Sequence, residues 1–300
     1  MNNMDIMRMG GNVNDRQVDL NRFASVMATD HSAGTSGKYS FIPTTRVVDI
    51  LERHNWLPSN VQEKRALKEG TRGFQTHLIR FRQPDNMQLA RVVGDLIPEI
   101  VLKNAHDGTA AFILMAGIFR LVCSNGMIVA DSMFASHKIR HIGFQDQNVI
   151  DAVFSVTEST PKIMGRVNEF KQIELDKPEQ VLLGEAALVA KYGEPGEGEA
   201  PLAQRYDVER LVRPIRTQDR ISQDYNAPRN TLWNTYNVVQ EKLIEKGGRF
   251  ARKEYEPAHG YTSGGFKTVK ARGVKSVSEN VRINQALWLI TERMFELKSH

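Results

Sequence analysis

Cysteine is nearly absent from this chain: its 300 residues include a single one, Cys123. One cysteine excludes an intramolecular disulfide and any metal site built from several thiolates, and it favours a reducing compartment. Long apolar runs are missing as well, since the longest, AAFILMAGIF at 110–119, has about half the length of a membrane-spanning helix. The N-terminal residues lack the basic and apolar regions of a signal peptide. We therefore expect a soluble, cytoplasmic protein.

A strong charge imbalance is also missing. The chain has 40 Lys and Arg against 35 Asp and Glu, a net charge of +5. Hydrophobic residues make up 41% and charged residues 25%, which is typical of a globular protein with a sizeable core. A mild excess of this size indicates a function only if its charges are concentrated in one place.

Familiar catalytic and phosphate-binding motifs are not found. There is no Walker loop, no GxSxG elbow and no GxGxxG after a predicted strand. His137 and His141 have the i,i+4 spacing of metal ligands on a helix, but the surrounding HKIRHIG alternates like a strand. Glu99 and Lys103 are four residues apart, where a nuclease Glu-x-Lys pair needs two. We expect no catalytic residues, no metal and no other cofactor.

The first half of the chain has the pattern of an α+β fold, an antiparallel β-meander flanked by helices. Apolar residues at helical spacing follow Thr44 and Thr45, either of which could be the N-cap. Asp107-Gly108 and Asn125-Gly126 are strong hairpin signals between apolar runs. We expect a helix over 44–54 and strands over 73–83, 97–105, 109–123 and 127–132.

The second half predicts a helical C-terminal block. Helical spacing begins near residue 146 and is expected to break near Pro161. Further helices are expected over 177–192, 231–246 and 278–298. The predicted organisation is a flexible N-terminal arm at 1–37 with one short helix near 18–27, an α+β core at 38–192, a connector at 193–229 and C-terminal helices at 230–300.

A basic strip at 246–275 lies between the last two predicted helices. It has eight Lys or Arg against two Glu, a net charge of +6 that exceeds the excess of the whole chain. Cations displace the counterions of a phosphate backbone, and aromatic rings stack on exposed bases, so the strip is typical of nucleic-acid binding. A solvated loop or hairpin is the alternative. The candidate ligand residues are Lys246, Arg249, Arg252, Lys253, Tyr255, Tyr261, Phe266, Lys267, Lys270, Arg272 and Lys275, and Phe250 is a further interleaved aromatic.

A second basic feature lies on the predicted sheet. Arg80 and Arg82 are two residues apart on one strand and so share a face. Lys103 and Arg120, on neighbouring strands, could join them in a basic groove for a single strand. Ion pairs of the arginines with Asp85, Asp95 or Glu99 remain the alternative. Cys123 lies in an apolar strand, where we expect it to be buried and inert.

Four stretches together carry a family resemblance. They are YSFIPTTRVVDILERHNW, HLIRFRQPD, NAHDGTAAFILMAGIFRLVCSNGMIVAD and NTLWNTYNVVQEKL with the later INQALWLITERM. In order, from about Tyr39 to Phe295, they resemble the phage and plasmid proteins of the domain of unknown function DUF932. The resemblance implies a role in the DNA metabolism of a mobile element. The layout is also similar in outline to Rad52-like single-strand annealing proteins, which form rings or filaments around a basic groove.

The leading hypothesis is a protein that binds single-stranded DNA, and alternatively RNA, and anneals strands during homologous recombination. It would act as a homo-oligomer, without catalysis and away from membranes. One alternative is a mobile-element protein whose basic strip binds an acidic host protein. Another is a Mg²⁺-dependent nucleic-acid enzyme using carboxylates, although no pair of them has a diagnostic spacing. The carboxylates weighed for it are Asp85, Asp95, Glu99, Asp107 and Asp131.

Overall fold

The computed structural model describes residues 18–36, 39–66, 71–85, 96–120, 127–128, 136–139, 145–214, 230–245, 247–254 and 266–299. Two compact units make up the chain: unit 1 is Met1–Gly165 with Ser276–Val281, and unit 2 is Arg166–Lys275 with Arg282–His300. The border between the units lies inside a long helix. The predicted arm and connector are described only at 18–36 and 193–214, and Cys123 and Asn125-Gly126 lie outside the described residues.

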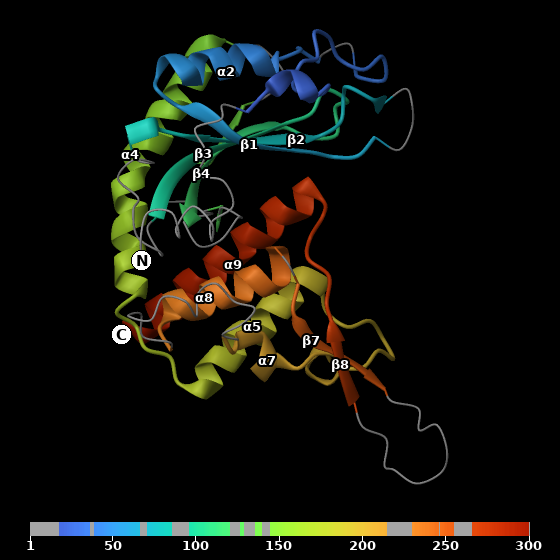
Figure 1. The fold of residues 1–300 in the computed structure, drawn as a ribbon, viewed down its shortest axis with the longest axis vertical. Helices are drawn as coiled ribbons and strands as arrows, with labels where there is room; N and C mark the ends of the chain where they lie inside the picture. Colours follow the sequence, from blue (N-terminus) through green and yellow to red (C-terminus); the bar gives the residue numbers. More distant parts are fainter. Residues whose placement is uncertain are drawn as a thin grey trace, which may run out of the picture. The chain divides into compact units, whose positions relative to one another are not determined.

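Unit 1 is built on an antiparallel sheet, which confirms the α+β class predicted from the sequence (Figure 1). Its strands run in the order β1-β2-β3-β4-β5, with β6 also paired to β4. Their bounds are β1 Leu57–Glu63, β2 His77–Arg82, β3 Leu96–Asn104, β4 Phe112–Arg120, β5 Met127–Ile128 and β6 Ser136–Ile139. Strand β1 (LPSNVQE) was not predicted, because an edge strand is only partly buried and shows little apolar alternation.

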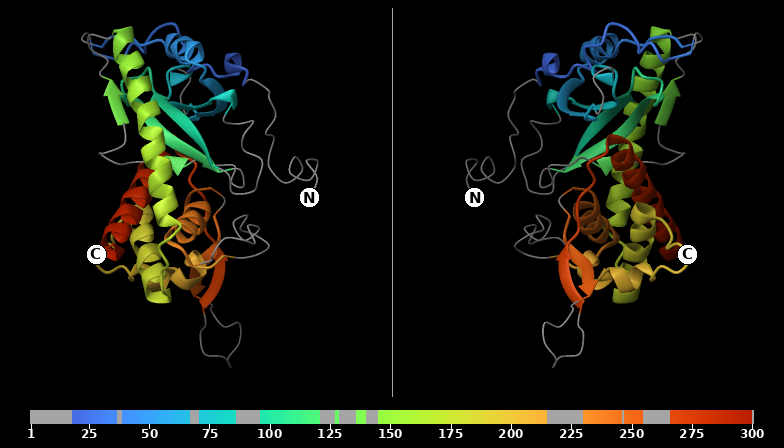
Figure 2. Two further views of the ribbon diagram at one scale, coloured as in Figure 1. Left: turned by 90° about the vertical axis from the view of Figure 1, so that its left-hand side faces the viewer. Right: turned by 90° about the vertical axis from the view of Figure 1, so that its right-hand side faces the viewer.

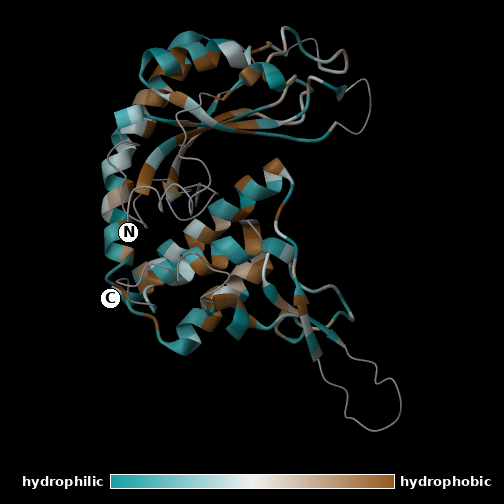
Figure 3. Ribbon diagram, viewed as in Figure 1, coloured by the Kyte–Doolittle hydropathy of each residue, from teal (hydrophilic) through white to brown (hydrophobic). Residues whose placement is uncertain are grey.

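One face of the sheet packs against helix α2 (Thr44–Arg53), which lies over the strands in Figures 1 and 2. The helix buries Val47, Val48, Ile50 and Leu51, as its periodicity predicts. In Figure 3 the strands carry long apolar stretches, whereas α2 alternates between apolar and polar residues. The N-cap is Pro43 and not a threonine, because the Thr44 hydroxyl is used inside the core.

The opposite face of the sheet holds a second apolar cluster. Leu78, Val101 and Met115, from three adjacent strands, pack with Val277 and Val281. The two valines lie in the first turns of helix α9 (Val277–Lys298), the terminal helix predicted from the sequence. Segments almost two hundred residues apart in the chain thereby complete the core of unit 1.

Two helical predictions were wrong. Helix α4 (Asp146–Phe170) continues through Pro161, where a break was expected. Buried residues follow the same stripe before and after the proline, so packing outweighs the cost of about 3 kcal/mol for the missing hydrogen bond. They are Val149, Ala152, Val153, Val156, Ile163, Val167 and Phe170. Near residues 18–27 the structure has only a short 3-10 helix, Leu20–Arg22, capped by the Asp19 side chain.

Unit 2 is mostly helical. Its elements are α5 Lys177–Tyr192, α6 Leu202–Arg205, α7 Val208–Val212, α8 Leu232–Gln240, the π-helical segment η4 Glu241–Glu245, β7 Arg249–Glu254, β8 Phe266–Lys270 and the greater part of α9. A Cβ on Gly184 of α5 would lie 2.7 Å from Val212 and 2.9 Å from Val208, so glycine allows α7 to pack closely on α5. Within the residues described, none of the helices is both long and apolar enough to cross a bilayer.

Candidate nucleic-acid interface

Strands β7 and β8 form a hairpin at the edge of the helices of unit 2 (Figure 1). Arg249 lies directly opposite Lys270, and Lys253 lies directly opposite Lys267. All four residues are exposed. Like charges in directly opposed positions destabilise a pair of strands. Strands β7 and β8 with these four cations are called the basic hairpin below. Repulsion within the two cross-strand pairs weakens the pairing of β7 with β8.

Carboxylates do not relieve this repulsion in the part of the chain that the structure describes, where no ion pair includes a cation of the basic hairpin. Arg252 differs from them, because it is half-buried and its Nη1 donates to the Ala203 carbonyl at 3.3 Å. Arg272 and Lys275 are exposed and follow β8 directly. Several of the cations predicted to bind phosphate are thus exposed on β7, on β8 and just after β8, while Arg252 attaches β7 to the Ala203 carbonyl.

A close backbone contact fixes the base of the hairpin. Gly247 has a φ of 67°, and a Cβ there would lie 1.9 Å from the Ala271 carbonyl oxygen. The Ala271 amide donates to the Gly248 carbonyl at 2.8 Å, and the Val274 amide donates to the Ile244 carbonyl at 2.7 Å. The residues entering the first strand and leaving the second are therefore held together.

A lysine of α5 strengthens the same base. Lys191 Nζ donates at 2.7 Å to the Leu243 carbonyl and at 2.7 Å to the Arg272 carbonyl. Burial of this ammonium lowers the pKa of Lys191 from 10.5 to about 8, so it is still mainly charged at neutral pH. One side chain thus ties η4 and the chain beyond β8 to α5.

The other edge of β7 is attached to the segment between α6 and α7. Tyr206 forms a β-bridge with Ala251, and the Asp207 amide donates to the Phe250 carbonyl at 2.6 Å. Phe250 is fully buried, so the interpretation of this ring as one of the strip's interleaved aromatics was wrong. Lys246, Tyr255 and Tyr261 lie outside the described residues, as does the side chain of Phe266.

The arginines of the sheet in unit 1 have a different environment. Arg80 Nη1 lies 2.6 Å from Glu99 Oε2, and Arg82 Nε lies 2.7 Å from Glu99 Oε1. The Arg82 guanidinium also stacks 3.6 Å above the centre of the Phe119 ring. The exposed fractions of the three charged side chains are 4%, 11% and 0%. Of the two interpretations left open by the sequence, the ion pair with Glu99 is therefore the one the structure has.

Lys103 and Arg120 are the other two cations of the predicted basic groove on the sheet. In the register, Lys103 lies opposite Leu78 and Ile113, on the same face as the two arginines. Partial burial lowers its pKa. Arg120 pairs with Leu96, and its side chain is outside the description. Among the described side chains of the predicted basic groove, Lys103 is half-buried and the two arginines are enclosed with Glu99.

A buried polar network between α2 and the sheet was not found from the sequence. Thr44 Oγ1 lies 2.9 Å from His77 Nε2 and 3.2 Å from His106 Nε2, and it accepts from Asn104 Nδ2 at 3.1 Å. His77 Nδ1 lies 3.3 Å from the Gln75 carbonyl, which can only accept, so Nε2 accepts the Thr44 proton. Burial lowers the pKa of His77 to about 4. Sequence spacing gives no signal for this network, since it joins residues far apart.

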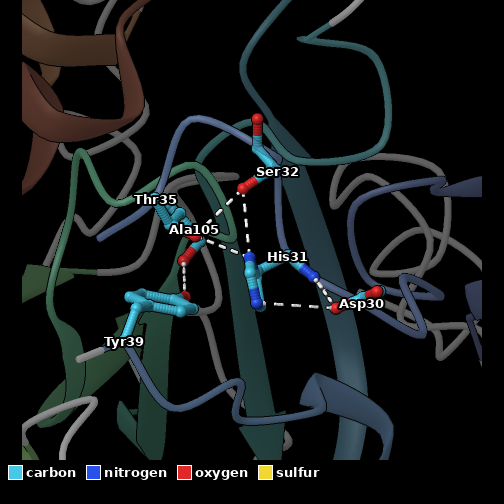
Figure 4. A network of polar contacts seen from close by, with 6 residues as sticks. All are labelled: Asp30, His31, Ser32, Thr35, Tyr39 and Ala105. Atoms are coloured by element: carbon cyan, nitrogen blue, oxygen red, sulfur yellow. Dashed lines mark hydrogen bonds and ion pairs between the residues drawn. The ribbon is translucent and has the colours of Figure 1, made fainter. Parts of the chain in front are cut away.

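A second polar network joins residues of 30–36 and Tyr39 to the chain after β3 (Figure 4). His31 Nδ1 lies 2.6 Å from Thr35 Oγ1, while Nε2 lies 3.8 Å from Asp30 Oδ1. The second distance is too long for a hydrogen bond, so the Asp30 carboxylate does not orient the His31 ring directly. The Ser32 amide donates to the His106 carbonyl at 2.9 Å, and the Tyr39 hydroxyl donates to the Ala105 carbonyl at 3.1 Å. The network therefore fastens these residues to the chain after β3.

In the part of the chain that the structure describes, no three His, Cys, Asp or Glu side chains come together in a way that could hold a metal ion. His137 lies on β6, and its predicted partner His141 lies outside the described residues.

Comparison with known proteins gives the family. The sequence matches the domain of unknown function DUF932 over residues 33–288, and the chain belongs to this family. It is similar to the UPF0380 proteins YafZ and YfjQ of Escherichia coli (strain K12), each 29% identical over 270 residues that cover 90% of this chain and 87% of the relative. No solved structure matches. The outline similarity to Rad52-like proteins therefore gains no support from a known fold.

Proposed function

We propose that this protein binds single-stranded nucleic acid, DNA in the first place, through the phosphate-binding cations of the basic hairpin. As a homo-oligomer without catalytic chemistry, it would anneal complementary strands during recombination of a mobile element. The observation that carries the proposal is the two pairs of directly opposed cations, Arg249–Lys270 and Lys253–Lys267.

The electrostatic argument begins with the cost of the arrangement. Two exposed like-charge pairs weaken the hairpin that carries them. A polyanion placed along the hairpin removes that repulsion and releases its own condensed counterions, so binding relieves a strain already present in the free protein. The buried arginines of unit 1 have a carboxylate between them and offer no such gain.

The dimensions of the hairpin suit a phosphate chain. The two cation pairs are three residues apart on β8, which corresponds to about 10 Å along a strand, and this odd spacing directs Lys267 and Lys270 to opposite faces of the hairpin. A phosphate chain that contacts both pairs must therefore pass from one face to the other, and about three nucleotides of a stacked strand, with a rise of about 3.4 Å each along its axis, cover the distance between the pairs. Its base is held by Gly247 and Lys191, so the four cations remain positioned before the ligand arrives.

The test is the affinity for a fluorescently labelled single-stranded oligonucleotide, measured by anisotropy at about 50 mM salt. Replacing Lys253 and Lys267 by Gln should weaken binding of every sequence roughly 5-fold or more, because two phosphate contacts are lost. The matched control replaces Lys64 and Lys162, exposed cations of unit 1, by Gln and should bind like the wild type. Equal affinities for all three proteins, or tight binding of an acidic polypeptide in place of the oligonucleotide, would contradict the proposal.

The annealing part of the proposal has its own measurement. Two complementary labelled strands should pair faster in the presence of the wild-type protein than alone, as followed by energy transfer between the labels. The Lys253→Gln, Lys267→Gln protein should lose this acceleration, while the Lys64, Lys162 control keeps it. Acceleration that survives in the hairpin variant would assign annealing to another surface.

A further inference from the structure

Two tyrosines of unit 2 form a stacked pair next to the basic hairpin. The rings of Tyr192 and Tyr206 are nearly parallel, at 14°, with centroids 4.6 Å apart. Tyr206 is almost buried, at 9% exposure, whereas Tyr192 is 38% exposed. Tyr206 therefore supports the ring of Tyr192 from below, and part of the Tyr192 side chain faces solvent.

The stacked pair is attached directly to the hairpin. Tyr206 forms the β-bridge with Ala251 of β7, and its ring lies 6.0 Å from that of Phe250. Tyr192 is the last residue of α5 and follows Lys191, whose ammonium binds the Arg272 carbonyl. The same contacts that position the cations thus position the exposed ring.

Positive charge lies next to the stacked pair. Lys191 Nζ lies over the Tyr192 ring, 5.0 Å from its centre, and the Arg205 guanidinium lies over the Tyr206 ring, 6.0 Å from its centre. A partly exposed aromatic ring that is supported by a second ring and has cations close by has the chemistry of a site for a negatively charged ligand with a flat ring.

We propose that Tyr192, supported by Tyr206, is a stacking platform for an unpaired nucleobase of a strand held by the basic hairpin. This inference rests on the proposed function and deepens it by assigning the ligand class. Bases inside a duplex are stacked on both sides, so only a single strand can offer a base to the platform. Stacking uses the face that every base has, so binding is tolerant of sequence.

The test compares two single-stranded probes of equal length, one with bases and one abasic along its length. Tyr192→Leu should weaken binding of the first roughly 5- to 150-fold and leave binding of the abasic probe unchanged, since only stacking is lost. Tyr192→Trp should bind the first probe at least as well as the wild type, and its added fluorescence should be quenched by that probe alone. Thermal unfolding of each variant checks that the fold is retained.

The outcomes separate this inference from the proposal on which it rests. If the wild type binds both probes equally, or if Tyr192→Leu loses affinity for both alike, the platform is refuted while phosphate binding by the hairpin stands. If the wild type binds neither probe, the proposed function fails and the platform fails with it. Retained affinity of Tyr192→Leu for the probe with bases would show that the tyrosine stack is internal packing only.

Discussion

Single residues in unit 1 show how burial determines the state of a titratable group. His77 is fully buried, and its two ring nitrogens are used by the Gln75 carbonyl and the Thr44 hydroxyl. Protonation would require a second donor where Thr44 already donates, in a site without solvent. The imidazole is therefore neutral in the folded core, and its protonation at low pH should lower the stability of the fold.

The first prediction concerns pH. The pKa of His77 is lowered from 6.5 to about 4 by folding, so between these values the unfolded chain binds more protons than the folded one. The free energy of unfolding should then fall as pH decreases from about 6.5 to about 4, by about 3 kcal/mol from this residue. Urea unfolding at several pH values measures it. A His77→Gln protein should lose this share of the acid dependence, and an unchanged profile would count against the assignment.

The second prediction concerns the enclosed Arg-Glu-Arg group. Glu99→Gln removes the negative charge that pairs with both Arg80 and Arg82 inside the core, so the protein should lose about 3–5 kcal/mol of stability. The matched control is Glu209→Gln, which breaks an exposed pair with Lys177 and should change stability far less, because solvent screens the two charges. Denaturant midpoints compare the two. Similar losses would mean that Glu99 does not compensate the two arginines.

At the scale of elements, the base of the basic hairpin depends on one glycine. Gly247→Ala would place a Cβ against the Ala271 carbonyl at a positive φ, so the backbone must move and stability should fall by about 2 kcal/mol or more. Gly165→Ala on α4, where a Cβ meets nothing within 4 Å, should instead stabilise by about 0.5–1 kcal/mol. Thermal unfolding checks both signs. A neutral Gly247→Ala would show that the base of the hairpin is not tightly closed.

Elements whose signals are local were predicted well from the sequence. The apolar spacing of α2 depends on neighbouring residues, as do the apolar runs of β3 and β4 on either side of the Asp107-Gly108 hairpin signal. Features that depend on a distant partner were not predictable. Pro161 remains helical because of packing, and β1 is a strand because β2 lies beside it.

The candidate site follows the same division. The charge concentration at 246–275 is a property of composition and was visible in the sequence. Which cations oppose one another depends on the register of β7 and β8, and the burial of Phe250 depends on its packing in unit 2. The sequence did not indicate Tyr192 as a candidate ligand residue, because its proposed role depends on the Tyr206 ring stacked against it.

At the scale of the whole molecule, the two basic features of the sequence have different environments, which the sequence alone did not distinguish. In unit 1 the arginines of the sheet are enclosed around a carboxylate. In unit 2 the cations of the hairpin are exposed and face one another. The enclosed ion pairs of unit 1 belong to a core, whereas the opposed, exposed cations of unit 2 are the arrangement expected of a surface that binds a polyanion.

The salt dependence of binding to a single-stranded oligonucleotide tests this account most directly. For single strands, the slope of log affinity against log salt is about −0.7 for each phosphate neutralised. The account predicts that the Lys253→Gln, Lys267→Gln protein has a slope shallower by about 1.4 than the wild type, because two neutralised phosphates are lost. The Lys64, Lys162 control should keep the wild-type slope. Identical slopes for all three proteins would contradict the assignment of phosphate binding to the basic hairpin.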